Sequence, residues 1–472
     1  MGHTYDRIIV NGTVLTAEGM QRLDIGIRNG RIACLTASIP ASEAEAPPVD
    51  AQGCWVLPGV IDAHVHLNEP GMGAWEGFDT GSAALAAGGV TTYIDMPLNG
   101  LPPTVDAKSL ELKLAAAQGQ SHVDYALWGG LVPWNLDRLE ELARAGVVGY
   151  KAFMSNPGGV GEGAFQEVDE ITLFEGMSCI ARMGGVLALH AESEAIVSKL
   201  ASRSLAAGKT AAADFAASRP VLAELEAVNR ALLFAELTGC ALHFVHISSS
   251  AAVKRIMRAK EWGLSVTVET CPHYLVLTDE DMGSLGPVAK CAPPLRNRKE
   301  QERLWSDVRS GRIDWIASDH SPCPTPLKQQ GDGNYFAAWG GISGAQSTLE
   351  LMITEGVLRR GIPPRLISRM LSEAPARRFG LYPHKGIIAV GADADLVVLD
   401  TDMPYTLAAG DLLYRHTHSP YVGYRMGCRV KTTVSRGAVV YELGRGIVTP
   451  GRGKWLRPLT GFASAVKKEG IG

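Results

Sequence analysis

The chain has 472 residues, of which 46% are hydrophobic and 20% are charged, and its formal net charge is −4. This length allows one large domain together with a smaller one. The slightly acidic balance argues against a nucleic-acid-binding protein, which needs a basic surface. No run of about 18 uncharged apolar residues predicts a membrane span.

Eight cysteines occur, and no two of them form a C-x-x-C pair. The sequence therefore favours neither a thiolate zinc site nor a redox motif. Several cysteines lie in apolar runs, which is typical of small buried side chains in a reducing compartment. The first residues, Met1 to Arg7, lack the apolar stretch of a secretory signal. We therefore expect a cytoplasmic protein.

Short alternating apolar runs near both ends of the chain predict β-strands. They cover residues 7–15, 23–27 and 31–35 near the N-terminus, and residues 394–400 and 430–441 near the C-terminus. Asn11-Gly12 and Asn29-Gly30 are tight-turn signals. We expect residues 1–57 and 382–472 to form one small β-sandwich domain built from both termini.

Residues 58–381 show a different pattern, in which short apolar strands alternate with amphipathic, helix-length stretches. Helices are expected at residues 107–118, 220–238 and 251–262. The eight strand candidates are residues 59–64, 90–96, 125–131, 146–153, 185–190, 241–246, 264–269 and 313–319. Such a series of β/α units predicts an α/β fold, a (β/α)8 TIM barrel. A doubly wound open sheet is the alternative, but no G-x-G-x-x-G follows the first strand.

Six residues at or just past the ends of these strands carry side chains that can bind divalent metals. The residues are His64, His66, Lys151, His190, His246 and Asp319. Imidazole and carboxylate are the usual ligands of zinc-type metals. His64 and His66 are two residues apart, so on a strand both can face one ion. The strand ends of a barrel converge on its catalytic face, where ligands far apart in the sequence can meet.

Two of the basic residues in these strands need separate interpretation. His243 lies three residues from His246 and faces the other side of a strand, so we expect it to pack in the core. Lys151 binds no metal as an ammonium. Burial pushes a lysine towards its neutral amine, which can add carbon dioxide to form a carbamate. A carbamate is anionic and resembles a carboxylate, so a carboxylated Lys151 could bridge two cations.

This set of residues predicts hydrolysis of an amide-type bond without a covalent enzyme intermediate. Two divalent ions lower the pKa of a bridging water to near neutrality, so that hydroxide forms and attacks a carbonyl polarised by one ion. Asp319 accepts the proton as general base and returns it to the leaving nitrogen as general acid. A Ser-His-Asp mechanism has less support, because Gly-x-Ser-x-Gly is absent.

From about Asp6 to about Gly451 the chain resembles the cyclic amidohydrolase branch of the amidohydrolase superfamily. The matching stretches are residues 58–66, 149–154, 189–192, 246–249, 271–275, 292–296 and 318–322. The resemblance implies a distorted (β/α)8 barrel with a small β domain from both termini. It also implies a binuclear metal centre, with His64, His66 and Asp319 at one ion, His190 and His246 at the other, and N6-carboxylated Lys151 between them.

Details within these motifs separate the members of the branch. Dihydroorotases carry a carboxylate-binding arginine where this chain has Asn68. Hydantoinases and dihydropyrimidinases carry a tyrosine at the position of Asn156 and a serine at that of Ala292. Five stretches are most similar to allantoinases, namely residues 67–71, 75–78, 95–99, 318–324 and 338–344. The resemblance thus implies opening of the hydantoin ring of allantoin to allantoate, in purine (ureide) catabolism.

The expected substrate contacts are Asn68 and three residues after Asp319, namely Ser321, Trp339 and Gly340. The latter three lie in a long loop rich in proline and glycine, and long loops in compact domains often bind ligands. Trp75, near the histidine pair, could form a wall of the pocket, although tryptophan is as often a core residue.

The resemblance leaves several properties open. The ligands suit zinc first, with iron, manganese or cobalt as alternatives, and relatives in this branch are often homotetramers. The rival function within the class is a hydantoinase or dihydropyrimidinase of broader specificity. A scaffold without catalysis would typically lack several of the six ligands, and a ureide-binding protein would bind metal without turnover.

Overall fold

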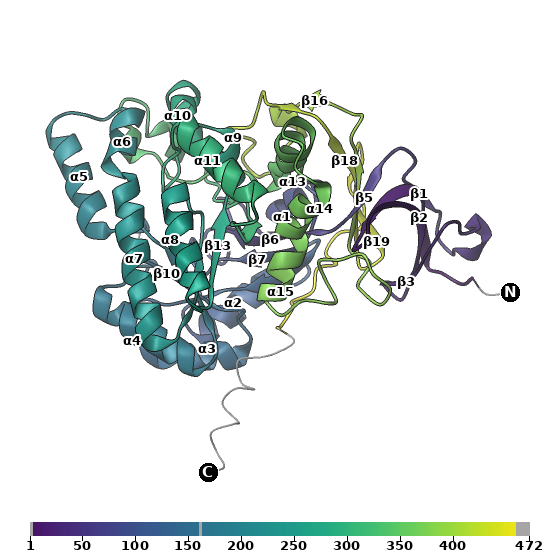
Figure 1. The fold of residues 1–472 in the computed structure, drawn as a ribbon, viewed down its shortest axis with the longest axis horizontal. Coiled ribbons are helices and arrows are strands. Elements are labelled where there is room, and N and C mark those ends of the chain that lie inside the picture. Colours follow the sequence, from purple (N-terminus) through teal and green to yellow (C-terminus); the bar gives the residue numbers. More distant parts are fainter. Residues whose placement is uncertain (1–2, 160–162, 459–472) are drawn as a thin grey trace, which may run out of the picture.

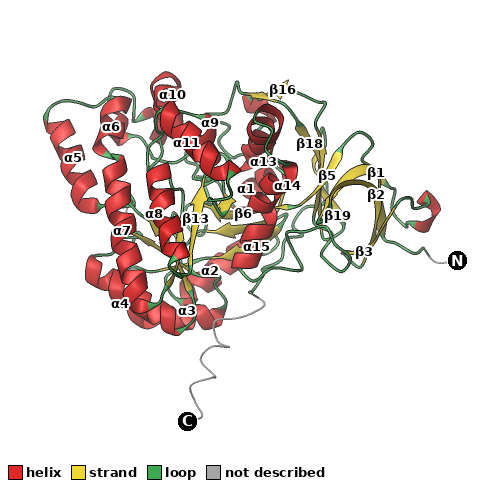
Figure 2. Cartoon of the chain, viewed as in Figure 1, coloured by secondary structure: helices red, strands yellow, loops and turns green. Residues whose placement is uncertain are grey.

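The computed structural model describes residues 3–159 and 163–458 of the chain. Figure 1 shows a large body with helices around central strands, beside a smaller body of strands. The yellow C-terminal strands lie next to the purple N-terminal strands, so both ends of the chain build the smaller body. The secondary-structure view in Figure 2 places most helices in the larger body.

The smaller body is a nine-stranded sheet. Its order is β20-β19-β18-β15-β5-β1-β2-β3, and β4 pairs with β1. The strands are β1 (Arg7–Thr16), β2 (Gly19–Arg28), β3 (Arg31–Thr36), β4 (Val49–Asp50), β5 (Trp55–Pro58), β15 (Leu396–Asp400), β18 (Arg429–Ser435), β19 (Ala438–Glu442) and β20 (Gly446–Ile447). Most strand pairs of the smaller body are antiparallel, but β1 pairs in parallel with β4 and β5. The strands predicted at both ends are confirmed, and hydrogen bonds between β5 and β15 join them in one continuous sheet.

The two asparagine–glycine signals have different outcomes. Asn29 and Gly30, with φ of 52° and 74°, form the turn between β2 and β3 as predicted. The turn predicted at Asn11-Gly12 is wrong, because both residues lie inside β1, where the pairing with β2 shifts by a bulge. A Cβ on Gly12 would lie 2.6 Å from the Val56 side chain. Glycine is therefore needed here for close approach of β5 rather than for a chain reversal.

The larger body contains the predicted parallel strands. They are β6 (Val60–Val65), β7 (Val90–Asp95), β8 (Asp124–Leu127), β9 (Gly129–Gly130), β10 (Tyr150–Phe153), β11 (Val186–His190), β12 (Ala241–Phe244), β13 (Val266–Thr270) and β14 (Trp315–Ile316). The first three form one sheet, and the other six form a second, in the order β14-β13-β12-β11-β10-β9. Trp128 interrupts the predicted strand at 125–131, which therefore appears as β8 and β9.

Hydrogen bonds link the two parallel sheets at both edges. At one edge, the N–H of Val148, two residues before β10, donates to the Leu127 carbonyl of β8 at 3.0 Å. At the opposite edge, the His66 N–H donates to the His320 carbonyl at 2.8 Å, and Val65 forms a parallel bridge with His320. The end of β6 therefore lies beside the segment that follows β14, so the first and last strands of the series are neighbours.

Helices alternate with these strands and lie outside them, as α4, α7 and α11 show in Figure 1. The α-helices are α1 (Phe78–Ala87), α2 (Ala107–Ala117), α3 (Leu139–Ala145), α4 (Glu170–Arg182), α5 (Glu194–Ala206), α6 (Ala212–Ser218), α7 (Val221–Thr238), α8 (Ser250–Glu261), α9 (Pro272–Val276), α10 (Asp279–Leu285), α11 (Arg298–Arg309), α12 (Thr325–Gln329), α13 (Thr348–Met352), α14 (Pro364–Ser368) and α15 (Ala374–Arg378). The predicted helices correspond to α2, α7 and α8. Within the described ranges, no helix is both long and apolar enough to cross a membrane.

A buried ion-pair cluster ties the two bodies together. Lys385 Nζ donates to a carboxylate oxygen of Asp395 at 2.6 Å and of Asp124 at 2.9 Å. Asp395 immediately precedes β15 of the terminal sheet, and Asp124 begins β8 of the parallel strands. Paired charges of this kind are tolerated in a core because each is satisfied by the others.

Candidate active site

His64, His66 and Asp319 converge at the carboxyl ends of the parallel strands. Asp319 Oδ1 lies 3.1 Å from His64 Nε2 and 3.5 Å from His66 Nε2. The two histidines come from the end of β6 and are almost fully buried, whereas the Asp319 side chain is 14% exposed. Asp319 is therefore the member of this group that solvent can reach.

His190 and His246 form a second group from the neighbouring strands. His190 is the last residue of β11, and His246 follows β12. His190 Nδ1 lies 3.0 Å from His246 Nε2, so two ring nitrogens face one another. The rings of His64 and His246 are 5.5 Å apart, centroid to centroid, so the two groups adjoin.

Lys151 interacts electrostatically with residues of both groups. It is the second residue of β10 and so lies inside the strand, slightly before the strand end that we expected. Its charge helps to lower the pKa of His190 and His246, while the Asp319 carboxylate acts to raise the pKa of Lys151. Nζ is fully buried and has no hydrogen-bond partner among the described residues, although it lies 4.9 Å from the centroid of the Phe153 ring.

Burial sets the protonation of these groups. It lowers the pKa of Lys151 to about 8 and lowers the pKa of His66, His190 and His246 below the ordinary histidine value. The imidazoles are therefore neutral at pH 7 and present free lone pairs. Burial also raises the pKa of Asp319, but His64 and His66 outweigh it and hold this pKa well below its usual range. Asp319 is therefore a carboxylate.

Buried glutamates orient the histidines from behind. Glu269 Oε1 lies 2.8 Å from His64 Nδ1, and Trp315 Nε1 donates to Glu269 Oε2 at 2.9 Å. Glu192 Oε2 lies 2.9 Å from His190 Nε2. These contacts direct His64 Nε2 and His190 Nδ1 into the site, as outer carboxylates do at metal-binding histidines. The sequence interpretation missed both glutamates, although Glu269 closes a predicted strand and Glu192 lies two residues after His190.

His243 packs in the core as predicted. It is fully buried, and its ring stacks on that of Trp315 with centroids 4.1 Å apart. Its Nε2 lies 3.3 Å from Glu269 Oε2. His243 therefore supports the outer carboxylate rather than the central group.

Three residues at these strand ends have left-handed backbone conformations. The φ angles are 65° at Asn68, 39° at His246 and 48° at Asp319. Residues other than glycine rarely adopt this backbone conformation. Where they do, they often lie at functional sites, and the surrounding structure holds them in the strained conformation. Here the backbone turns sharply at the residues whose side chains form the site.

The donor atoms fit divalent cations. One ligand atom each from His64, His66 and Asp319 lies within 4.8 Å of the other two. The facing nitrogens of His190 and His246 form a second donor pair, and His246 Nδ1, like Lys151 Nζ, has no hydrogen-bond partner among the described residues. Neutral imidazoles and a carboxylate in a buried cluster are ligands of zinc-type metals.

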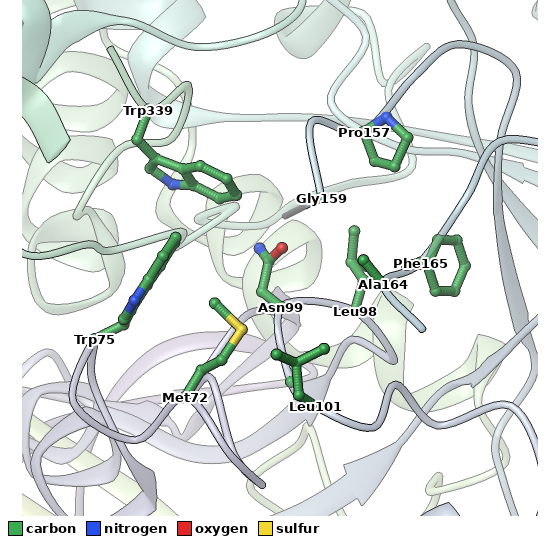
Figure 3. Close-up of a pocket in the computed structure, with 11 residues that line it drawn as sticks. Met72, Trp75, Leu98, Asn99, Leu101, Pro157, Gly159, Ala164, Phe165 and Trp339 are labelled. Carbon is green, nitrogen blue, oxygen red and sulfur yellow. The ribbon is translucent and has the colours of Figure 1, made fainter. Parts of the chain in front are cut away.

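A pocket with about 400 Å³ of empty space, part of which is open solvent, lies beside this cluster. Trp75 and Trp339 form one wall, with ring centroids 4.8 Å apart and one edge against the other's face. Figure 3 shows these tryptophans on one side, Phe165 on the other, and Asn99 between them. Asn99 connects the pocket to the cluster, because its Nδ2 lies 3.4 Å from His66 Nδ1.

The four predicted substrate contacts have different positions. Asn68 is buried; its Nδ2 donates to the Asn99 carbonyl at 3.2 Å, and its Oδ1 has no partner among the described residues. Trp339 lines the pocket, and its Nε1 donates to the Ser321 carbonyl at 3.4 Å. Ser321 is buried near Asp319, while Gly340 is exposed to solvent. Three of the four thus adjoin the pocket or the cluster.

Comparisons with known proteins place this geometry in a family context. The model of the amidohydrolase family matches residues 55–440. The chain is 48% identical to an allantoinase of Rubrobacter xylanophilus and 49% identical to one of Deinococcus radiodurans, over 96% of this chain and 98% of each relative.

Solved structures give the same picture. The L-hydantoinase (dihydropyrimidinase) from Arthrobacter aurescens superposes with a TM-score of 0.92 at 36% identity, covering 96% of this chain and 100% of that chain. A D-hydantoinase (dihydropyrimidinase) from Thermus sp. has a TM-score of 0.88 at 29% identity, covering 97% and 100%.

Proposed function

The chain belongs to the amidohydrolase family, and on that premise we propose that it is a hydrolase of the cyclic amide bond of allantoin, giving allantoate. The observation that carries the proposal is the convergence of two histidine groups, Lys151 and Asp319 at one set of strand ends, beside a pocket. The similarity of nearly the whole chain to allantoinases, at 42–49% identity, also supports the proposed function. The pathway context is purine catabolism.

The clustered side chains would hold two divalent cations. His64, His66 and Asp319 would bind one ion, His190 and His246 the other, with Lys151 between them. When bound, such ions activate a water molecule and polarise the substrate carbonyl. Zinc suits this donor set, as do iron, manganese and cobalt. The buried glutamates Glu269 and Glu192 support the assignment, because they fix which ring nitrogen each partner histidine presents.

Lys151 would bridge the ions as N6-carboxylysine. Its neutral amine adds to carbon dioxide, forming a nitrogen–carbon bond and releasing one proton to solvent. Three observations support this modification: the amine is fully buried, burial lowers its pKa to about 8, and Nζ has no hydrogen-bond partner among the described residues. An unmodified ammonium there would oppose both cations, whereas a carbamate neutralises part of their charge.

Asp319 would move the proton. As a carboxylate with a partly exposed side chain, it can take the proton of the attacking water and return it to the ring nitrogen that leaves. Its left-handed backbone directs the side chain towards His64 and His66 and so fixes the position of the carboxylate.

The substrate side of the site fits a neutral ureide. Asn68 offers an unpartnered carbonyl oxygen to a ureide N–H, where an arginine would select a carboxylate. Trp339 would form the wall over the ring, with Ser321 and Gly340 supplying further contacts from the same loop. Hydrogen bonds rather than ion pairs would therefore position allantoin.

Turnover of allantoin by the metal-loaded protein tests this function directly. We expect wild type to release allantoate and Lys151→Ala to lose both activity and bound metal. Lys108→Ala, at an exposed lysine of α2, is the matched control and should behave as wild type. Metal retention together with full turnover in Lys151→Ala would rule out the bridging role.

A hydantoinase of broader specificity is the second candidate. The pocket is lined mainly by apolar side chains, among them Met72, Leu98 and Phe165, which suit a hydrocarbon substituent. Both solved structures above are hydantoinases. Paired assays on allantoin and on 5-substituted hydantoins separate the two, and a higher kcat/KM on the hydantoins would favour this candidate.

The parallel strands would close into a distorted (β/α)8 barrel over residues 58–381. The bridge between Val65 and His320 supports closure, because it joins the first strand to the segment after the last. Residues 1–57 and 382–472, of which 1–2 and 459–472 lie outside the described residues, are our proposed boundaries of a separate small β-sandwich domain. Its described part has the buried side chains of Val14, Ile25 and Val398 at its centre.

Homo-oligomerisation, as a tetramer, is a further part of the proposal. Leu222, Leu233 and Leu237 lie on one stripe of α7 and are 62%, 52% and 65% exposed. Exposed leucines at this spacing support an interface between copies. Light scattering of wild type and of Leu237→Lys measures the oligomeric state.

The eight free cysteines, all within the described residues, support a reducing compartment such as the cytoplasm.

A further inference from the structure

A second cluster of donor atoms adjoins the site and shares Asp319 with it, while its other two members, Cys271 and His273, have none of the roles above. One ligand atom each from Cys271, His273 and Asp319 lies within 4.8 Å of the other two. Cys271 follows β13, and His273 is the second residue of α9. Asp319 follows β14, the strand that pairs with β13. The cluster is therefore built by two adjacent strand ends and shares Asp319 with the group of His64 and His66.

His273 makes this cluster unusual. Its side chain is fully buried, yet neither ring nitrogen has a hydrogen-bond partner among the described residues. Its ring packs against that of Tyr274, with centroids 4.2 Å apart, which satisfies the apolar faces and neither nitrogen. A buried imidazole with two orphaned nitrogens is costly unless a ligand completes it. A neutral imidazole in this position offers one free lone pair to such a ligand.

The three donors define the class of ligand. A thiol sulfur, an imidazole nitrogen and a carboxylate oxygen together suit zinc and softer ions such as cadmium, whereas magnesium and calcium prefer oxygen donors alone. An ion with strong affinity for sulfur displaces the thiol proton, which leaves to solvent as the metal–sulfur bond forms.

We propose that Cys271, His273 and Asp319 form a third cation site, which takes excess zinc or cadmium and inhibits the enzyme. Cation binding there rests on this cluster alone. The inhibition rests on the proposed function, because an ion held by Asp319 together with Cys271 and His273 withdraws this carboxylate from His64 and His66 and from proton transfer. Asp319 is the partly exposed member of the three, so the ion enters from the mouth of the active site and competes with substrate.

Titration of the metal-loaded enzyme with cadmium tests the site through ultraviolet cadmium–thiolate absorption. The six proposed ligands of the catalytic centre include no cysteine, so exchange of the catalytic ions produces no such band. We expect a band that saturates at one equivalent, with loss of allantoin turnover over the same concentrations. Cys271→Ser should abolish the band, and His273→Gln should weaken cadmium binding at least about tenfold.

Cys240→Ser is the matched control. Cys240 is equally buried but precedes β12, at the opposite end of a neighbouring strand. It should leave the band and the inhibition as in wild type. Absence of the band in wild type, or a band of equal size in Cys271→Ser, would overturn the site whether or not that variant keeps full stability. A normal band with no allantoin turnover in wild type would instead contradict the proposed function and leave the cation site standing.

Discussion

His190 Nδ1 and His246 Nε2 lie 3.0 Å apart, although 56 residues separate them in the chain. Burial lowers the pKa of both rings, so two neutral imidazoles face each other. Glu192 occupies the outer nitrogen of His190, which leaves Nδ1 directed at His246. In the proposed metal centre, this uncharged pair would share one cation.

Removal of His246 should therefore empty one of the two proposed metal positions. We expect His246→Ala to lose about half of the bound metal and most of its activity, because the remaining imidazole cannot hold an ion alone. Elemental analysis after dialysis measures the metal content. His384→Ala, at a half-buried histidine beside the terminal sheet, is the control. Unchanged stoichiometry in His246→Ala would contradict the assignment.

Substitution of Asp319 tests proton transfer. Asparagine keeps the size of the side chain and loses the charge, so we expect kcat to fall by about 10²–10⁴ with a smaller change in KM. Steady-state kinetics on allantoin measure both constants. Asp332→Asn changes an exposed aspartate in the same loop region and should have little effect. A kcat for Asp319→Asn near that of wild type would exclude Asp319 as the base.

These residues show what a sequence can predict. His64 and His66 follow from strand periodicity, and Lys151, His190, His246 and Asp319 follow from their places near strand ends. Their meeting follows from the expected fold, since parallel strands present these ends on one face. The periodicity of strands, and the histidines and carboxylates at their ends that commonly bind metals, can therefore be recognised in the amino-acid sequence alone.

The outer contacts could not be predicted in this way. Glu269 reaches His64 across 205 residues, and a glutamate at a strand end is as often a surface charge. Similarly, the turn signal at Asn11-Gly12 becomes a bulge because Val56 of another strand packs against it. In both cases a partner distant in the sequence decides the role, and no local pattern records that partner.

The loop that carries Trp339 is held by two buried lysines. Lys328 Nζ donates to the carbonyls of Trp339 and Gly341, and Lys290 Nζ donates to those of Phe336 and Ala338. Burial lowers the pKa of Lys328 to about 8 and that of Lys290 to about 7. These amino groups therefore fix the backbone on both sides of the proposed pocket wall.

We expect Lys328→Met to raise KM for allantoin several-fold with little change in kcat. The variant leaves two buried carbonyls without a donor and loosens Trp339, while Asp319 and the histidines stay in place. Steady-state kinetics give the split between the two constants. Lys260→Met, at a partly exposed lysine paired with Asp314, controls for loss of charge. An unchanged KM would show that the loop keeps its position without this lysine.

Glu350 provides a pH-dependent test of the contact between α13 and the terminal sheet. Its Oε1 accepts the Val430 N–H at 2.7 Å, and its Oε2 accepts the Tyr405 hydroxyl at 2.6 Å. Burial raises the pKa of Glu350 to about 7, above the ordinary value of a glutamate. The folded protein then keeps a proton that the unfolded chain has already released. The contribution of Glu350 to stability is therefore full below its ordinary pKa and is lost as the pH rises to about 7.

Glu350→Gln should consequently stabilise the protein at pH 8 and have little effect near pH 4. A neutral amide can still accept from Val430 and donate to Tyr405, but it avoids burying a charge, so the gain at pH 8 should reach about 3 kcal/mol. Thermal unfolding of both proteins at the two pH values measures the difference. Glu111→Gln, at an exposed position of α2, should shift neither curve. A gain of equal size at both pH values would mean that packing, rather than the ionisation of Glu350, is responsible.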